Sequence, residues 1–303
     1  MLASLLNGGK SALAAALARI EESPDSVETV ALLDAAYVAA RAHVVGITGP
    51  PGVGKSSLAG ALIPLWRASG RRVGVIAVDP TSRQSGGALL GDRTRLATDP
   101  EDDGVFVRSM AARERLGGLS ALTMPAAMVM RALYDLLVVE TVGVGQSETE
   151  IAALADTVVL CVQPGSGDSL QFMKAGVVEI PHVVVVTKAD MGAAARRARA
   201  DVEGALGLSP ARDGWTTPVL DVSTVTRSGF DALIDALDRR WRFLAEAGRL
   251  ADRRHGQAES WLAATLRERF GREGARKAGA VALAAGEPPF GRLSKIVAAL
   301  ART

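Results

Sequence analysis

The stretch GPPGVGKS, residues 49–56, decides the fold predicted for this chain. It matches the pattern G-x-x-x-x-G-K-[ST] of phosphate-binding loops. A short β-branched run, residues 43–48, precedes it and a helical pattern, residues 54–69, follows it, which is the order that such a loop requires. Backbone N–H groups of the loop and of the helix start bind phosphate oxygens. We therefore predict a nucleotide site in which Lys55 reaches the β- and γ-phosphates and Ser56 binds Mg²⁺.

Further apolar runs indicate a sheet that is covered on both faces. They alternate with helical patterns, which is typical of a doubly wound, mostly parallel α/β sheet. The predicted strands are 43–48, 72–79, 105–110, 134–141, 157–163, 182–188 and 217–223. The predicted helices between them are 54–69, 116–131, 147–155, 168–179 and 193–206. The pattern predicts the fold of a P-loop NTPase.

Helical sequence flanks the strand-rich part on both sides. We predict an N-terminal helical extension over 1–42, made of two helices, with Ser23 as the N-cap of the second and Pro24 as its first residue. The nucleotide-binding domain then spans 43–245, and a C-terminal helical arm spans 246–303. The helical patterns that close the chain cover 229–247, 251–272, 274–285 and 290–302.

Composition excludes several classes of function. The chain has 303 residues, with 35 Lys plus Arg and 33 Asp plus Glu, so its net charge is +2. This balance gives no argument for binding nucleic acid or a membrane surface. One Cys and three His cannot build a disulfide framework or a Cys-rich metal site. No apolar run reaches the roughly 18 residues of a membrane span, so we expect a cytoplasmic protein.

Acidic residues end two of the predicted strands. Glu140 follows the run LLVV, and a carboxylate in this place can hold Mg²⁺ or orient the attacking water. The spacing Glu140-x-x-Gly143 is similar to the D-x-x-G switch of GTPases, in which the Gly amide contacts the γ-phosphate. Asp79 at a strand end and Asp92 in the long polar segment 79–104 are further candidates for the Mg²⁺ site. A solvated surface charge is the alternative for each of these carboxylates.

The sequence TKAD, residues 187–190, favours guanine as the base. It resembles the N-K-x-D motif, with Thr187 in the place of Asn. Asp190 would accept hydrogen bonds from guanine N1 and the 2-amino group, donors that adenine lacks. The aliphatic stem of Lys188 would cover the ring. The run 223–225, at the end of the last predicted strand, could supply a backbone contact to guanine O6.

Five blocks, in this order, resemble the MeaB/ArgK family of G-proteins. They are GITGPPGVGKSS (46–57), VIAVDPTSRQSGGALLGDRTR (75–95), YDLLVVETVGVGQSETE (134–150), VQPGSGDSLQFMKAG (162–176) and VVTKAD (185–190). That family belongs to the SIMIBI class and chaperones adenosylcobalamin-dependent methylmalonyl-CoA mutase. Some of its members carry an older label as lysine/arginine/ornithine transport ATPases. The resemblance extends over about residues 10–245.

The resemblance implies a GTPase that binds GTP or GDP with Mg²⁺ and serves a B12-dependent methylmalonyl-CoA mutase or its adenosyltransferase. It also implies switch segments at 79–95, 140–150 and 164–174, and a homodimer held by the C-terminal arm. The implied catalytic residues are Lys55, Asp92 and Glu140, and the implied Mg²⁺ site comprises Ser56, Asp79, Asp92 and Glu140. The implied nucleotide-binding residues are Gly49, Pro50, Pro51, Gly52, Val53, Gly54, Lys55, Ser56, Ser57, Gly143, Thr187, Lys188, Ala189, Asp190, Ser223, Thr224 and Val225.

Two other functions stay open at this point. A metal-insertion GTPase would carry a His-rich or Cys-rich ligand cluster, and this sequence has no C-x-C and only scattered His. A small-molecule P-loop kinase would need an acceptor pocket and a lid, and it has no use for the TKAD sequence.

Overall fold

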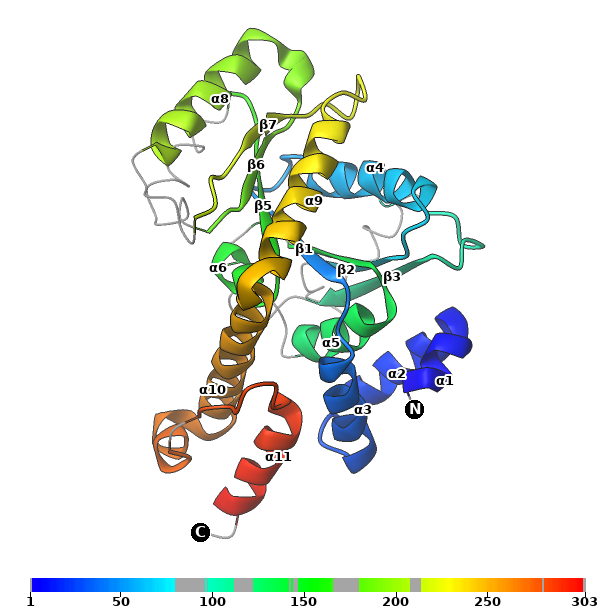
Figure 1. The fold of residues 1–303 in the computed structure, drawn as a ribbon, viewed down its shortest axis with the longest axis vertical. Helices are drawn as coiled ribbons and strands as arrows, with labels where there is room; N and C mark the ends of the chain where they lie inside the picture. Colours follow the sequence, from blue (N-terminus) through cyan, green and yellow to red (C-terminus); the bar gives the residue numbers. More distant parts are fainter. Residues whose placement is uncertain are drawn as a thin grey trace, which may run out of the picture.

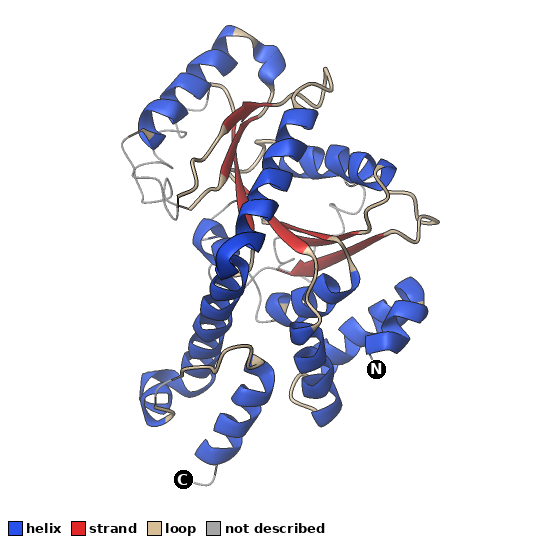
Figure 2. Ribbon diagram, in the orientation of Figure 1, coloured by secondary structure: helices blue, strands red, loops and turns tan. Residues whose placement is uncertain are grey.

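A seven-stranded sheet forms the centre of the computed structural model (Figures 1 and 2). The structure describes residues 2–79, 96, 98–111, 122–141, 143, 147–165, 180–207, 214–279 and 281–301, with Asp79, Ala111 and 147–149 described by their backbone alone. The strands are β1 His43–Thr48, β2 Val73–Asp79, β3 Val105–Ala111, β4 Leu136–Glu140, β5 Thr157–Val162, β6 Val183–Val186 and β7 Val219–Asp221. Their order in the sheet is β3-β2-β4-β1-β5-β6-β7.

All of the strand pairings are parallel, which confirms the predicted doubly wound fold. Strand β1 lies between β4 and β5, with Val45 opposite Val138 on one side and Thr157 on the other. Because parallel strands end at the same edge, the loops after β1, β4, β5, β6 and β7 meet at the carboxyl edge of the sheet. Ligands bind at this edge in such folds.

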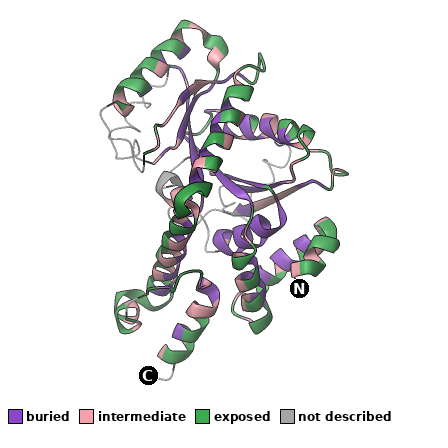
Figure 3. Cartoon of the chain, viewed as in Figure 1, coloured by how far each residue is buried: buried purple, intermediate pink, exposed green. Residues whose placement is uncertain are grey.

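Helices cover both faces of the sheet, which explains why the central strands β1, β4 and β5 are buried at every residue (Figure 3). The helices that follow strands of the sheet in the chain are α4 Lys55–Ala68, α5 Thr123–Leu133, α6 Ser147–Ala152, α8 Ala193–Leu206 and α9 Phe230–Ala245. Helices α4 and α9 pack on one face, and α5, α6 and α8 pack on the other, together with helix α3 Val27–Val38. The predicted helix 168–179 lies outside the described residues.

Three helices, rather than the predicted two, precede β1: α1 Leu2–Asn7, α2 Gly9–Glu22 and α3. The predicted N-cap at Ser23 is wrong, because Ser26 is the residue in this position. The Ser26 hydroxyl accepts a hydrogen bond from the Thr29 amide at 3.2 Å, the spacing that a side-chain cap requires. Helix α3 therefore begins three residues later than the sequence suggested.

The end of the chain is helical, as predicted, but one of its helices is shorter than expected. Helix α10 Arg249–Lys277 is interrupted at Gly271, whose φ of 68° and ψ of −174° are not helical, so two helical segments meet there, close to the predicted break between 272 and 274. The predicted helix 274–285 is wrong beyond Lys277, because residues 281–284 are not helical. Helix α11 Pro289–Leu300 then packs back on α10 and α3. No helix in the described ranges is long and apolar enough to cross a membrane.

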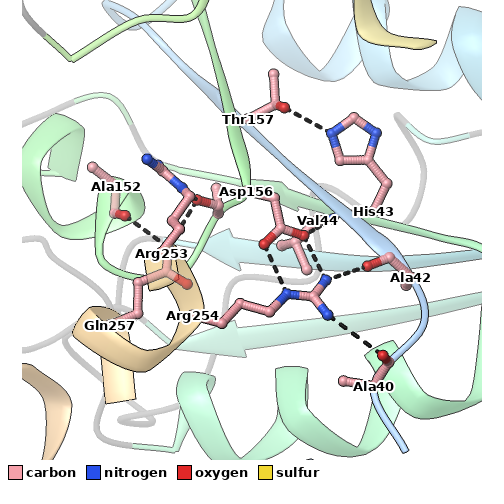
Figure 4. Close-up of polar contacts among 11 residues, drawn as sticks. Ala40, Ala42, His43, Val44, Ala152, Asp156, Thr157, Arg253, Arg254 and Gln257 are labelled. Carbon is pink, nitrogen blue, oxygen red and sulfur yellow. Dashed lines mark hydrogen bonds and ion pairs between the residues drawn. The ribbon is translucent and has the colours of Figure 1, made fainter. Parts of the chain in front are cut away.

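A buried ion pair attaches helix α10 to the amino edge of the sheet (Figure 4). The Asp156 carboxylate precedes β5, is fully buried, and accepts two hydrogen bonds from the Arg254 guanidinium, at 2.7 and 3.0 Å. The Val44 amide donates to the same carboxylate at 2.9 Å, and Arg254 also donates to the Ala42 carbonyl at 2.6 Å. The arm is thus anchored to β1 and β5, at the edge opposite the phosphate-binding loop.

Candidate nucleotide site

The phosphate-binding loop connects the end of β1 to the start of α4. Gly49 has a φ of 138°, and a Cβ at this position would collide with the carbonyl oxygen of Cys161 on β5. Gly54 has a φ of 103° and is the N-cap residue of α4. Only glycine adopts both conformations without strain. The G-x-x-x-x-G spacing is therefore needed for the backbone to turn between the strand and the helix.

The Lys55 side chain folds back across the loop. Its ammonium donates hydrogen bonds to the carbonyls of Gly49, at 2.8 Å, and of Pro50, at 3.1 Å, and the residue is buried. The cation therefore lies against the loop, next to the start of α4. Amides at a helix start with a cation beside them are suited to a phosphate chain.

An oxygen pair lies beside the loop at the first turn of α4. The Ser56 hydroxyl donates to the Glu140 carboxylate at 2.5 Å, and Glu140 is buried at the end of β4. Mg²⁺ prefers oxygen ligands and is usually held by one or two protein groups together with substrate phosphates. These two residues fit that requirement. Asp79 is the last residue of β2, next to β4, but only its backbone is described, and Asp92 lies outside the described residues.

Gly143 approaches the phosphate-binding loop closely. Its φ is 79°, and a Cβ at this position would collide with the Gly49 carbonyl oxygen and lie 2.6 Å from the Lys55 ammonium nitrogen. The loop after β4 therefore reaches the same surface as Lys55 and the Ser56–Glu140 pair. Gly143, the glycine of the predicted D-x-x-G-like segment, thus lies against the phosphate-binding loop.

A neutral thiol lies beneath the loop. Cys161 is fully buried in β5, and burial raises the pKa of its thiol to about 12, although Lys55 acts in the opposite direction. The thiol is therefore protonated at physiological pH and adds no negative charge near the phosphate site. This agrees with the prediction of a small core residue.

A cavity of about 290 Å³ lies beside the phosphate-binding loop, at the carboxyl ends of β6 and β7. Its lining residues are Val53, Gly54, Ser57, Leu58, Thr187, Lys188, Asp190, Met191, Val222, Thr224 and Val225. Leu58, Met191 and Val222 were not predicted from the sequence. These apolar side chains give the cavity walls suited to a planar base.

Thr187 links the base cavity to the phosphate-binding loop. Its buried hydroxyl lies 2.8 Å from the Val53 carbonyl oxygen and 3.1 Å from that of Val162 on β5. Both partners are backbone acceptors, so the hydroxyl donates to them and does not point toward a base. Thr187 therefore ties the base-binding turn to the phosphate-binding loop and to β5.

Asp190 lies at the end of the cavity and is exposed. One of its carboxylate oxygens accepts a hydrogen bond from the Ser223 hydroxyl at 2.5 Å. Ser223 is itself fully buried and accepts a hydrogen bond from the Thr226 amide at 3.2 Å. Of the predicted run 223–225, Ser223 therefore holds the Asp190 carboxylate by a hydrogen bond and does not line the cavity. Thr224 and Val225 line the cavity.

Several predicted nucleotide-binding residues do not line the base cavity. Pro50, Pro51 and Gly52 belong to the phosphate-binding loop, and Ala189 donates its amide to the Val222 carbonyl at 3.2 Å. Ala189 therefore holds the base-binding turn against β7 through its backbone. The phosphate surface and the base cavity adjoin at residues 53 and 54, so one nucleotide can occupy both.

Comparison with known proteins identifies close relatives over most of the chain. Residues 13–277 match the family model described as "Methylmalonyl Co-A mutase-associated GTPase MeaB". A putative GTPase of Pyrococcus horikoshii is 43% identical over 263 residues, which are 84% of this chain and 81% of that protein. The methylmalonic aciduria type A homolog of Mus musculus, a mitochondrial protein, is 36% identical over 72% of this chain and 54% of its own length.

Solved structures with a similar fold also cover most of the chain. The crystal structure of an LAO/AO transport system kinase superimposes with a TM-score of 0.70 at 28% identity, covering 91% of this chain and 87% of that chain. A nickel complex of HypB from Helicobacter pylori has a TM-score of 0.50 at 15% identity, covering 71% of this chain and 94% of its own. The second match supports the fold alone.

Proposed function

The chain belongs to the MeaB family of methylmalonyl-CoA mutase-associated GTPases, and from this premise we propose that it is a GTP-driven chaperone of a B12-dependent methylmalonyl-CoA mutase. In this proposal GTP binding and hydrolysis control the loading or protection of the mutase's cofactor. The adenosyltransferase that supplies the cofactor is a second candidate partner. The C-terminal arm, residues 246–303, is proposed to hold a homodimer.

The proposal that the nucleotide is GTP rests on one observation: the Asp190 carboxylate lines the base cavity. Asp190 accepts from Ser223 through one oxygen, which fixes its orientation toward the cavity. Guanine offers two N–H donors to a carboxylate, and adenine would leave that carboxylate desolvated and without a donor. We propose that the stem of Lys188 covers the ring and that residues 224 and 225 contact its edge.

Each group at the phosphate surface has a proposed role in hydrolysis. Lys55 balances charge on the β- and γ-phosphates, and the loop amides with Gly143 bind their oxygens. Ser56 and Glu140 are proposed to hold Mg²⁺, with Asp79 and Asp92 as further carboxylates of that site. Bound Mg²⁺ would neutralise the charge that develops on the transferred phosphoryl group.

The proposed switch segment lacks one residue that small GTPases use for hydrolysis. Val144, rather than Gln, follows Gly143 directly, so the residue that orients water in small GTPases is missing from that position. We therefore expect slow intrinsic hydrolysis that a partner accelerates. Partner-supplied groups are worth about 10³–10⁵ in rate in known GTPases.

Exchange of Asp190 for Asn tests the base assignment. Asp190→Asn should weaken GDP binding and favour xanthosine diphosphate, because the amide donates where the carboxylate accepted. Ser223 can still donate to the amide oxygen, so the loop should keep its shape. Asp201→Asn, at an exposed carboxylate on α8, is the matched control and should leave both affinities unchanged. Equal affinity of the wild type for ADP and GDP would contradict the assignment.

Hydrolysis with and without a partner tests the chaperone role. Single-turnover GTP hydrolysis is measured alone and with a cobalamin-dependent methylmalonyl-CoA mutase, and the mutase should accelerate it. A fast intrinsic rate that the mutase leaves unchanged would instead favour a free-standing GTPase, or the metal-insertion class.

A further inference from the structure

The backbone of Lys188 adopts a conformation that non-glycine residues avoid. Its φ is 54° and its ψ is 41°, in the left-handed region. This conformation costs free energy in every residue except glycine, and it persists where the surroundings hold it. The contacts of the Lys188 side chain identify what holds it.

The Lys188 ammonium has two acceptors on two different segments. It donates to the Gly52 carbonyl of the phosphate-binding loop at 3.1 Å and to the Gln163 side-chain oxygen at 2.7 Å. Gln163 directly follows the last residue of β5. The shorter contact is the one to Gln163, a residue that no motif of the nucleotide site includes.

A second hydrogen bond joins the same two segments, one residue earlier in each. Val162 accepts from the Thr187 amide at 2.8 Å through its carbonyl, and the next residue, Gln163, accepts from Lys188. Two consecutive residues at the end of β5 therefore hold two consecutive residues of the base-binding turn. Gln163 is not among the residues that line the cavity, but its side-chain oxygen contacts a residue that does, Lys188.

We propose that Gln163 is a positioning residue that sets how long the nucleotide is retained, by fixing the Lys188 stem over the base. This inference rests on the proposed function, because it takes guanine nucleotide as the occupant of the cavity. Without the amide oxygen, the ammonium keeps one protein acceptor, Gly52, and the lysine stem gains rotational freedom. The base then loses its cover in part of the population, and the nucleotide leaves faster.

Release of a fluorescent GDP analogue measures the effect. Gln163→Leu removes the acceptor at similar size and is expected to accelerate release about 5- to 10-fold, as for loss of one exposed charge-assisted hydrogen bond. Gln163→Glu restores an acceptor and should return the rate to within about twofold of the wild type. Single-turnover hydrolysis at saturating GTP tests whether the change is confined to binding, and thermal unfolding tests for loss of structure.

A double-mutant cycle with Lys188→Met separates positioning from a general structural role. In the Lys188→Met background, Gln163→Leu should have no further effect on release. The inference is overturned if Gln163→Leu releases GDP at the wild-type rate, if it accelerates release equally in the Lys188→Met background, or if Gln163→Glu behaves like Gln163→Leu. Failure of the wild type to prefer GDP over ADP would instead refute the proposed function.

Discussion

Replacing Gly143 with Ala is expected to separate nucleotide binding from hydrolysis. The new Cβ would collide with the Gly49 carbonyl and lie 2.6 Å from the Lys55 ammonium nitrogen. Both neighbours belong to the phosphate-binding surface. The base cavity, including Asp190 and Thr187, is not touched by this change.

Two separate effects set the size of the change. A left-handed conformation costs alanine about 1–2 kcal/mol, which lowers the stability of the whole protein. The contact with Lys55 is about 1 Å shorter than ordinary van der Waals separation, so the ammonium or the loop must move by about that distance. A misplacement of about 1 Å at a reacting centre costs about 100-fold in rate. We expect about that loss in hydrolysis, with a smaller change in GDP affinity.

Gly70→Ala provides a matched control. Gly70 has the same φ, 79°, but a Cβ there would meet nothing within 4 Å. Urea unfolding should show the cost of the left-handed conformation in both variants, with an added loss in Gly143→Ala from the collision with the Gly49 carbonyl. Single-turnover hydrolysis should fall only in Gly143→Ala. Hydrolysis by Gly143→Ala within a few fold of the wild type would refute the placement of Gly143 against the phosphate site.

Two further predictions concern the amino edge of the sheet, where His43 begins β1 and Arg254 pairs with Asp156. Burial lowers the pKa of His43 from 6.5 to about 4. Between these two values the unfolded chain binds a proton at His43 and the folded chain does not. The free energy of unfolding should therefore fall by about 2 kcal/mol from about pH 7.5 to about pH 5. Urea unfolding should show this part of the pH dependence disappear in His43→Gln, and an unchanged dependence would contradict it. Arg254→Ala leaves Asp156 buried and unpaired and should cost about 3–5 kcal/mol; a loss below about 1 kcal/mol would show that the pair is not an anchor.

The central sheet could be predicted because its strands are buried on both faces. Runs such as 183–186 are apolar at every position, a pattern that depends on little beyond the chain itself. The glycines of the phosphate-binding loop are similarly local, since Gly49 and Gly54 need positive φ angles. The start of α3 was mispredicted because Ser23 and Ser26 are both acceptable caps, and only the geometry with Thr29 decides between them.

Contacts between distant residues left no pattern in the sequence. Arg254 is one of many arginines in the C-terminal arm, and Asp156 lies 98 residues away from it in the chain. Gln163 and Lys188 are joined only because β5 and β6 end side by side. Thr187 stands where the N-K-x-D motif has Asn, and the backbone acceptors of its hydroxyl are visible only in the fold.

The positions of the arm and the nucleotide site constrain how one could influence the other. Arg254 holds the amino ends of β1 and β5, while Gly49 and Gln163 follow the carboxyl ends of the same two strands. A six-residue strand is about 20 Å long, and β1 and β5 are each hydrogen-bonded to a neighbouring strand on both sides. The arm should therefore move with the central strands as one body. A partner bound to the arm could then change hydrolysis by approaching the loops at the opposite edge, rather than by deforming the sheet between them.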